Sequence, residues 1–307
     1  MPGPDFLIAG AAKSGTTSLY HYLNQHPEIY MSPVKEPDYF GGHLWKLPLY
    51  NIFGPNASLQ IYQDWNEYTD LYVKAGRRLK GEASPSTLFF HDVAIPEIKK
   101  RLGDPKIIIF LRNPVERSYS HYSFLKRDDK ENLSFKESLE QEEMRKIQNY
   151  HYGYFYRSLG FYAGQVSAFT HAFSNVYIGL FEDLINHPKE TLGEVFKFLE
   201  VDDSFQPEIT AFNASGNPRS GRLNAFLRKK NVIRDIARPF IDLIMSEKFK
   251  NRLVEKILQA NMSEKDPIPE DVANQLQQDY TEDIRQLELV IGRDLSAWMK
   301  VPAKETH

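Results

Sequence analysis

The chain has 307 residues, of which 41% are hydrophobic and 26% charged, as in ordinary globular proteins. Its formal net charge of −3 provides no general basic field for nucleic acid, although a local cluster of Lys and Arg can still bind one anionic ligand. The chain contains no cysteine, which excludes disulfides, thiolate catalysis and zinc sites built on Cys. The length suits one large α/β domain, and we expect a single domain over residues 1–307.

The N-terminus runs almost directly into an expected strand, with no pattern of a signal peptide. No apolar run is long enough for a transmembrane helix. The absence of cysteine fits a reducing compartment. These features together predict a cytoplasmic protein without a transmembrane segment.

Residues 5–20 predict a strand, a small-residue turn and a helix that starts near Thr16. Backbone N–H groups at a helix start have no partner within the helix and favour an anion, and Gly10 and Gly15 let the backbone approach that anion closely. Lys13 adds a positive charge. Hydroxyl donors come from Ser14, Thr16, Thr17 and Ser18. The segment therefore predicts a site for a phosphate or similar oxyanion, against the alternative of an ordinary strand–turn–helix.

This loop differs from the usual nucleotide loop, G-x-x-x-x-G-K-[ST], in which the lysine follows the second glycine and the hydroxyl binds magnesium. Here Lys13 precedes Gly15, and no Gly-Lys-Ser/Thr occurs in the segment. The pattern therefore indicates phosphate binding but is a poor match for ATP hydrolysis.

A carboxylate follows the next expected strand, at residues 28–31. Pro33 and Pro37 bracket Lys35 and Glu36, which predicts an extended, stiff segment at a strand end. Ligands of open α/β sheets bind at the carboxyl ends of the strands, so Glu36 is a candidate general base. The alternative is a surface Lys–Glu pair beside a turn.

Residues 41–62 show no clear period and predict a long loop of the kind that forms lids, in which Trp45 either stacks on an acceptor or packs on the body. A helix is expected over 64–75 and a strand over 78–82. Glu82 at the end of that strand is a second carboxylate candidate, or else it orients Lys13 or Lys35 through an ion pair.

A second anion element follows the helix expected over 92–102. Lys106–Leu111 is apolar enough for a strand buried on both faces. Arg112 stands at its end, Pro114 marks a helix start, and Ser120 lies on that helix. A guanidinium offers a planar fork for phosphate oxygens, so Arg112 and Ser120 can converge on one phosphate.

The remaining chain predicts elements without clear chemistry, apart from one polar loop at 213–222 that can close over an anion or serve as a solvated linker. The helical region over 223–262 is basic on one side, which is a solvated face or, as the weaker alternative, a site for an acidic acceptor or membrane surface. The other expected elements are a charged helix over 134–148, a fifth strand over 176–181, a helix over 188–199 and an amphipathic helix over 271–300.

Three of these segments carry a family resemblance. Lys-Ser-Gly-Thr-Thr-Ser-Leu at 13–19 resembles the 5′-phosphosulfate loop of sulfotransferases that use 3′-phosphoadenosine 5′-phosphosulfate (PAPS). The strand–Leu-Arg-Asn-Pro–helix–Ser segment resembles the 3′-phosphate element of the same family. The resemblance covers essentially the whole chain and is to the bacterial type, related to the heparan-sulfate and carbohydrate enzymes. It includes Lys-Glu-Pro-x-x-Phe at 35–40, the family segment that carries the catalytic glutamate.

The resemblance implies an α/β fold of the P-loop NTPase-like sulfotransferase type, three layers around a mainly five-stranded parallel sheet. It implies sulfuryl transfer from PAPS to a hydroxyl or amine, leaving PAP, with no metal. The acceptor would be a carbohydrate or other small hydroxylated metabolite, although Ala83 stands where the glycosaminoglycan enzymes have lysine. The implied catalytic residues are Lys13, Lys35 and Glu36. The implied nucleotide-binding residues are Lys13, Ser14, Gly15, Thr16, Thr17, Ser18, Arg112, Ser120, Tyr162, Arg219 and Ser220; for Tyr162, core packing is the alternative.

Two other function classes stay open. One is a kinase or NTPase on the same fold, against which the displaced Lys13 argues and which magnesium-dependent ATP turnover would support. The other is a non-catalytic PAP-binding module, against which the Lys13–Glu36 combination argues. If Glu36 is not the base, Glu82 and then His43 are the next candidates.

Overall fold

The computed structural model describes residues 3–42, 61–209 and 266–300. Its centre is a five-stranded sheet in the order β2-β3-β1-β4-β5, in which every neighbouring pair is parallel. Phe6 of β1 lies opposite Gly81 of β3 and Lys106 of β4. The strands are β1 Phe6–Gly10, β2 Ile29–Met31, β3 Leu79–Ala83, β4 Lys106–Leu111 and β5 Val176–Leu180. The five expected strands and the parallel sheet are confirmed.

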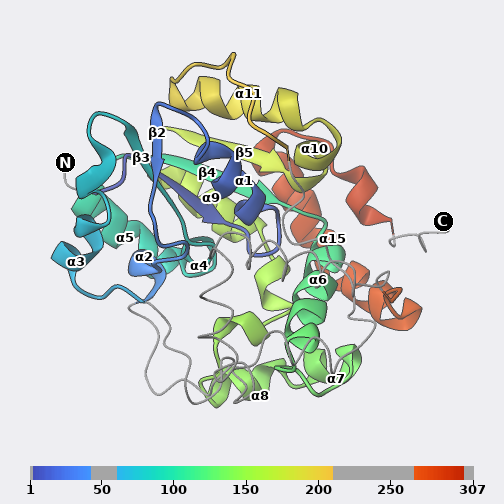
Figure 1. The fold of residues 1–307 in the computed structure, drawn as a ribbon. Coiled ribbons are helices and arrows are strands. Elements are labelled where there is room, and N and C mark those ends of the chain that lie inside the picture. The colour runs from blue at the N-terminus through green and yellow to red at the C-terminus, as the bar shows by residue number, and fades with distance from the viewer. Residues whose placement is uncertain (1–2, 43–60, 210–265, 301–307) are drawn as a thin grey trace, which may run out of the picture.

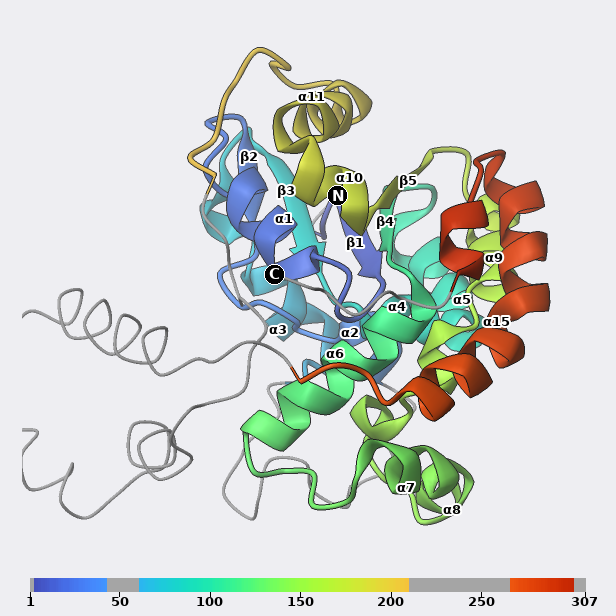
Figure 2. The same cartoon turned by 90° about the vertical axis from the view of Figure 1, so that its right-hand side faces the viewer.

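Helices cover both faces of the sheet, because alternate side chains of each strand point to opposite faces. Phe6 and Ile8 belong to a core with α1 (Thr16–Leu23), α10 (Phe181–Asn186) and α11 (Pro188–Leu199). Leu7 belongs to the other core, with α5 (His91–Leu102), α9 (Ala163–Ala172) and α15 (Glu270–Ile291). Figures 1 and 2 show these layers, with α9 and α15 on the side of the sheet away from α1. The three-layer α/β/α arrangement is confirmed.

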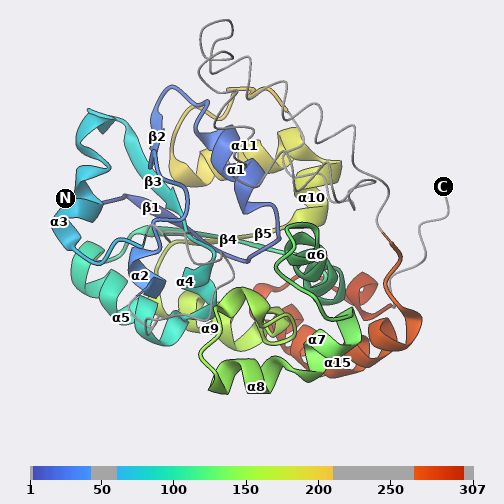
Figure 3. The same cartoon turned by 60° about the horizontal axis from the view of Figure 1, so that its bottom comes forward.

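Further helices and turns complete the described fold. Figure 3 shows α7 and α8 beside α6, at the end of the molecule away from α11. The further helices are α2 Tyr39–Gly42, α3 Trp65–Asp70, α4 Ser86–Phe89, α6 Pro114–Arg127, α7 Phe135–Glu140 and α8 Glu142–Ile147. The 3₁₀ turns lie at Val73–Ala75, Tyr152–Tyr154, Ser158–Gly160 and Ser296–Met299.

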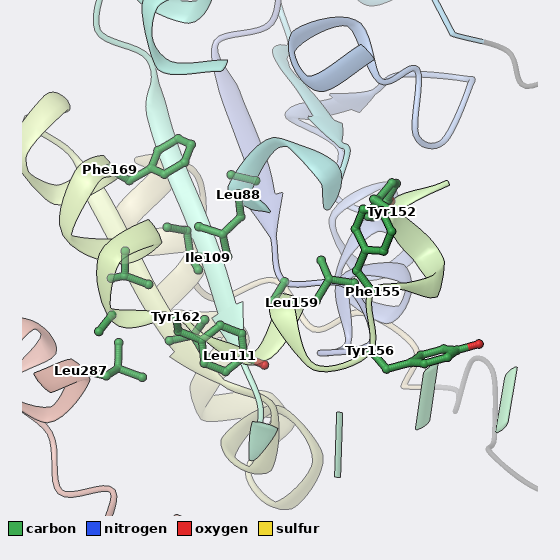
Figure 4. Close-up of a cluster of buried hydrophobic side chains, with 14 of the residues drawn as sticks. Leu88, Ile109, Leu111, Tyr152, Phe155, Tyr156, Leu159, Tyr162, Phe169 and Leu287 are labelled. Carbon is green, nitrogen blue, oxygen red and sulfur yellow. The ribbon is translucent and has the colours of Figure 1, made fainter. Parts of the chain in front are cut away.

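The larger core lies against the end of β4. In Figure 4, Ile109 and Leu111 of β4 lie close to Leu88 of α4 and to Tyr162 and Phe169, at the start of α9 and within it. All five are buried. Burial of apolar surface contributes about 25 cal/mol of folding free energy per Å² and is the main favourable contribution to folding. This packing therefore holds the end of β4 in place.

Three expected helices differ from the structure. The helix over 134–148 is divided into α7 and α8 at Gln141. The helix over 64–75 is α3 followed by a 3₁₀ turn. The helix over 271–300 ends at Ile291, because Gly292 adopts a left-handed conformation (φ 64°) that terminates it.

The expected loop around Trp45 and the expected helical region over 223–262 lie outside the described residues. No helix within 3–42, 61–209 or 266–300 is both long and apolar enough to cross a bilayer. Those ranges also hold no group of three or more His, Cys, Asp or Glu side chains arranged to bind a metal.

Candidate active site

The candidate site lies where β1, β2, β3 and β4 end. Because all four strands are parallel, the segments that follow them meet at the same edge of the sheet. These segments carry Lys13 after β1, Glu36 after β2, Ser84 after β3 and Arg112 after β4.

The loop after β1 adopts the geometry expected of an anion site. Lys13 and Gly15 both have left-handed backbones, with φ 69° and 86°, and α1 starts at the next residue, Thr16. A Cβ on Gly15 would lie 3.0 Å from a Leu184 methyl and 3.1 Å from the Phe181 ring, so both conformation and space require glycine. A left-handed turn before a helix start directs successive N–H groups toward one point.

The hydroxyl groups of this loop are buried with it. Ser14, Thr16 and Ser18 are buried and Thr17 is half-buried. The Ser14 hydroxyl lies close enough to the Tyr162 phenol to influence its pKa, yet it has no hydrogen-bond partner of good geometry among the described residues. A buried hydroxyl without a partner is costly unless a ligand accepts from it, so the loop fits a phosphate or sulfate oxygen.

Lys13 is surrounded by other cations. Its Nζ lies 4.2 Å from the centre of the Phe124 ring on α6, and the guanidinium of Arg127 lies 4.9 Å from the same ring. Burial, followed by the charges of Arg127 and Arg112, lowers the pKa of Lys13 to about 7, while the charge of Glu36 acts in the opposite direction. Three cations gathered beside a helix start favour binding of a multiply charged anion, although Arg112 and Arg127 also pair with Glu116 and Asp128.

Arg112 directly follows β4 and is 6% exposed. Its Nε and NH2 donate to Oε2 of Glu116 at 3.3 and 2.9 Å, and its guanidinium lies 4.5 Å from the centre of the Phe181 ring. Ser120 is buried on α6, one helical turn before Phe124 and therefore on the face that contacts Lys13. The structure thus brings Arg112 and Ser120 to the same side as the β1 loop.

Tyr162 is fully buried, and its position is that of a core residue. Its hydroxyl donates to the carbonyl oxygen of Arg112 at 3.1 Å, and its own N–H donates to Asp283 of α15 at 2.7 Å. Burial raises the pKa of Tyr162 to about 12. The residue therefore supports Arg112 through the backbone, and direct contact with a nucleotide stays a prediction.

The segment around Glu36 is not extended, and this expectation was wrong. Glu36 has φ 59° and Asp38 has φ 52°, so a left-handed turn encloses Pro37. The N–H of Glu36 donates to the carbonyl oxygen of Ala83 at 3.1 Å, and this tertiary bond overrides the preference of a residue before proline for extended backbone. Lys35 donates to Oε1 of Glu36, whose side chain is 41% exposed.

Glu82 occupies a different environment from Glu36. It is 1% exposed and accepts a hydrogen bond from Ser84 at 3.3 Å, and among the described residues it forms no ion pair with Lys13 or Lys35. Burial, followed by the charge of Asp38, raises the pKa of Glu82 to about 8. An acceptor can reach the exposed carboxylate of Glu36 but not that of Glu82, so the geometry favours Glu36 as the base and does not support an orienting ion pair from Glu82.

Arg219, Ser220 and His43 lie outside the described residues. The sequence had not singled out Phe124, Arg127 or Asp38 as site residues. Phe124 and Arg127 follow Ser120 at helical spacings of four and seven, which was the available signal. Asp38 occupies a variable position of the Lys-Glu-Pro-x-x-Phe pattern and had no such signal.

Comparisons with known proteins show the family of the chain. The model of the sulfotransferase domain matches residues 3–288. The crystal structure of a sulfotransferase from Alicyclobacillus acidocaldarius is 31% identical, covers 97% of this chain and 99% of its own, and superposes with a TM-score of 0.75.

Two curated relatives also match. Carbohydrate sulfotransferase 15 of Homo sapiens is 26% identical over 297 residues, which cover 77% of this chain and 52% of that protein. The membrane-associated sulfotransferase kil1 of Dictyostelium discoideum is 36% identical over 121 residues, 39% of this chain and 23% of that protein. The chain thus spans about half the length or less of these curated relatives.

Proposed function

Because the chain belongs to the sulfotransferase family, we propose that it transfers the sulfuryl group of PAPS to a hydroxyl or amine of an acceptor and releases PAP. The acceptor class that we propose is a carbohydrate or another small hydroxylated metabolite. The similarity to carbohydrate sulfotransferase 15 supports this choice, while Ala83, at a position where glycosaminoglycan enzymes have lysine, argues against assuming a heparan-like acceptor.

In this proposal the two ends of the nucleotide bind to two separate elements. The loop from Ser14 to Ser18 holds the 5′-phosphate through its backbone N–H groups and hydroxyls, and Lys13 lies beside the bridging oxygen. Arg112 and Ser120 hold the 3′-phosphate. Arg219 and Ser220 are proposed to close over it from outside the described residues.

The reaction is an in-line displacement at sulfur. The acceptor oxygen or nitrogen forms a bond to sulfur while the bond from sulfur to the 5′-phosphate oxygen breaks, and the acceptor proton passes to the Glu36 carboxylate. The leaving phosphate gains charge in this step, and the Lys13 ammonium stabilises that charge. Lys35, hydrogen-bonded to Glu36, orients the carboxylate.

One observation carries the proposal. Lys13 of the anion loop lies within electrostatic range of both Arg112 and Glu36, which belong to segments after two other strands. An anion site and an accessible carboxylate thus occupy one place at the edge of the sheet. Positioning the two reactants together supplies much of the rate of a group transfer.

Calorimetry with PAP, adenosine 5′-phosphate and ATP–Mg²⁺ tests the binding half of the proposal. We expect PAP to bind at least about tenfold more tightly than adenosine 5′-phosphate, because the latter cannot engage Arg112. Equal affinities would contradict the two-phosphate assignment. Tight ATP–Mg²⁺ binding with turnover would instead support a kinase or NTPase.

Incubation with ³⁵S-labelled PAPS and a panel of desulfated chondroitin, heparan sulfate and small hydroxylated metabolites tests the transfer half. Label appearing in any acceptor supports the enzyme. PAP binding without label in any member of this panel or in cell extracts would favour the non-catalytic binding module.

A further inference from the structure

The turn that carries Glu36 is hydrogen-bonded to buried polar side chains at the end of β3 and the start of α4. Asp38 is 6% exposed, although a free carboxylate is rarely buried. Its N–H donates to the Ser84 hydroxyl at 3.1 Å, and its Oδ1 accepts a hydrogen bond from the Ser86 hydroxyl. Ser84 in turn donates to Glu82 at 3.3 Å. The turn is therefore fastened to the segment between β3 and α4 through Asp38.

Asp38 also fixes the backbone on both sides of itself. Its carbonyl oxygen accepts a hydrogen bond from the N–H of Gly42 at 2.7 Å, and this bond is the first of α2. The φ of Asp38 is 52°, in a region that few non-glycine residues occupy. Such a conformation is unfavourable for a non-glycine residue and persists only where the surroundings hold it. Here the bonds to Ser84 and Ser86 hold it, and Glu36, two residues earlier, adopts a left-handed conformation as well.

The surroundings of Asp38 weaken the preference of its side chain for the charged form. Burial, followed by the charge of Glu36, raises the pKa of Asp38 to about 7, whereas the hydrogen bond from Ser86 and the charge of Lys35 act in the opposite direction. No Lys or Arg forms a salt bridge with it among the described residues. Its hydrogen bonds with Ser84 and Ser86 use its N–H and Oδ1, and neither bond requires a negative charge.

We propose that Asp38 is a positioning residue, whose side chain holds the left-handed turn through the hydrogen bond from Ser86, beside the backbone bond to Ser84, so that the Glu36 carboxylate faces the acceptor. This role rests on the proposed function for its catalytic consequence, but not for its structural one. It acts through hydrogen bonds and not through charge, so asparagine should replace Asp38 and alanine should not.

The first test needs no substrate. Amide hydrogen exchange of the free protein, followed at Glu36 and Gly42, should be about tenfold faster in Asp38→Ala, the scale of one lost hydrogen bond, and near the parent rate in Asp38→Asn. Ser86→Ala should act in the same direction, and the double variant with Asp38→Ala should add little, because both changes break one bond. Parent-like exchange in Asp38→Ala would overturn the proposal whether or not the protein transfers sulfate.

The second test separates positioning from general destabilisation. Asp38→Ala should bind PAP within about twofold of the parent and lower transfer from ³⁵S-labelled PAPS to the glycan panel by about 10- to 100-fold, the cost of a misplaced catalytic group. Asp38→Asn should restore most of that transfer. Equal losses in both variants would mean that the charge of Asp38 is required, and a parallel loss of PAP affinity would mean a general structural role; either result contradicts the proposal.

Asp5→Ala is a matched control at the opposite edge of the sheet. Asp5 also accepts a backbone hydrogen bond, from Lys80 at 2.8 Å, but it lies at the start of β1. The Asp5→Ala variant should have a lower melting temperature but unchanged amide exchange at Glu36 and unchanged sulfuryl transfer per folded molecule. Absence of transfer by the parent itself would contradict the proposed function and leave the exchange test of Asp38 decisive.

Discussion

The cationic half of the site and its acidic half differ in the state of their buried ionisable groups. The cationic half, formed by Lys13, Arg112 and Arg127, gathers like charges around a loop of N–H groups. In the acidic half, Asp38 and Glu82 are buried without a salt bridge to any described cation, and burial raises the pKa of both. A cluster of like charges beside a helix start indicates a binding site, whereas buried carboxyls with raised pKa values form a support. Glu36 is the exposed carboxylate between them.

The largest expected effect concerns Glu36. Glu36→Gln keeps the shape and the hydrogen bond of the side chain but cannot take a proton, so turnover with the acceptor found in the panel should fall at least about 100-fold. Calorimetry should find PAP binding close to that of the parent. Glu67→Gln, on exposed α3, is the control and should change neither quantity. Turnover within a few-fold of the parent would exclude Glu36 as the base, and a joint loss of binding and turnover would make it structural.

A smaller effect is expected in the cationic half. Arg112→Ala should cost about 1.5–3 kcal/mol of PAP affinity, the range of a charge-assisted hydrogen bond, and should leave the weaker affinity for adenosine 5′-phosphate nearly unchanged. Arg101→Ala, which removes an arginine paired with Glu97 on α5, is the control. If Arg112→Ala weakens both nucleotides equally, Arg112 does not read the 3′-phosphate.

The smallest effect is a pH dependence. The pKa of Lys13 is lowered to about 7 in the free protein, and a bound phosphate would raise it, so binding above pH 7 requires proton uptake. The contribution of Lys13 to PAP affinity should therefore be constant well below pH 7, where Lys13 is already protonated. Between pH 7 and 8.5 the affinity should fall roughly tenfold. Calorimetry in buffers of different ionisation enthalpy measures the uptake directly. The dependence should disappear in Lys13→Met, and its persistence there would assign it to another group.

Local patterns predicted most of the scaffold and the cationic half of the site. Local patterns predicted all five strands, and small residues with Lys13 predicted the anion loop, since both depend on residues close together in the chain. The turn at Glu36 could not be predicted in this way, because the rule for residues before proline favours extended backbone and only the distant Ala83 and Ser84 reverse it. Arg127 was missed for a similar reason: it approaches Lys13 only after α6 packs beside the β1 loop.

The contact between Tyr162 and Arg112 links the site to the last helix of the described fold. Asp283 of α15 accepts from the N–H of Tyr162, whose hydroxyl donates to the carbonyl oxygen of Arg112. Asp283 lies 121 residues after Tyr162 in the sequence, whereas the loop around Lys13 is local. Contacts between residues so distant in sequence form late in folding, because the intervening chain must be ordered first. The anion loop around Lys13 depends on residues close together in the chain and can form early, whereas Arg112 is fixed in place only after α15 has docked.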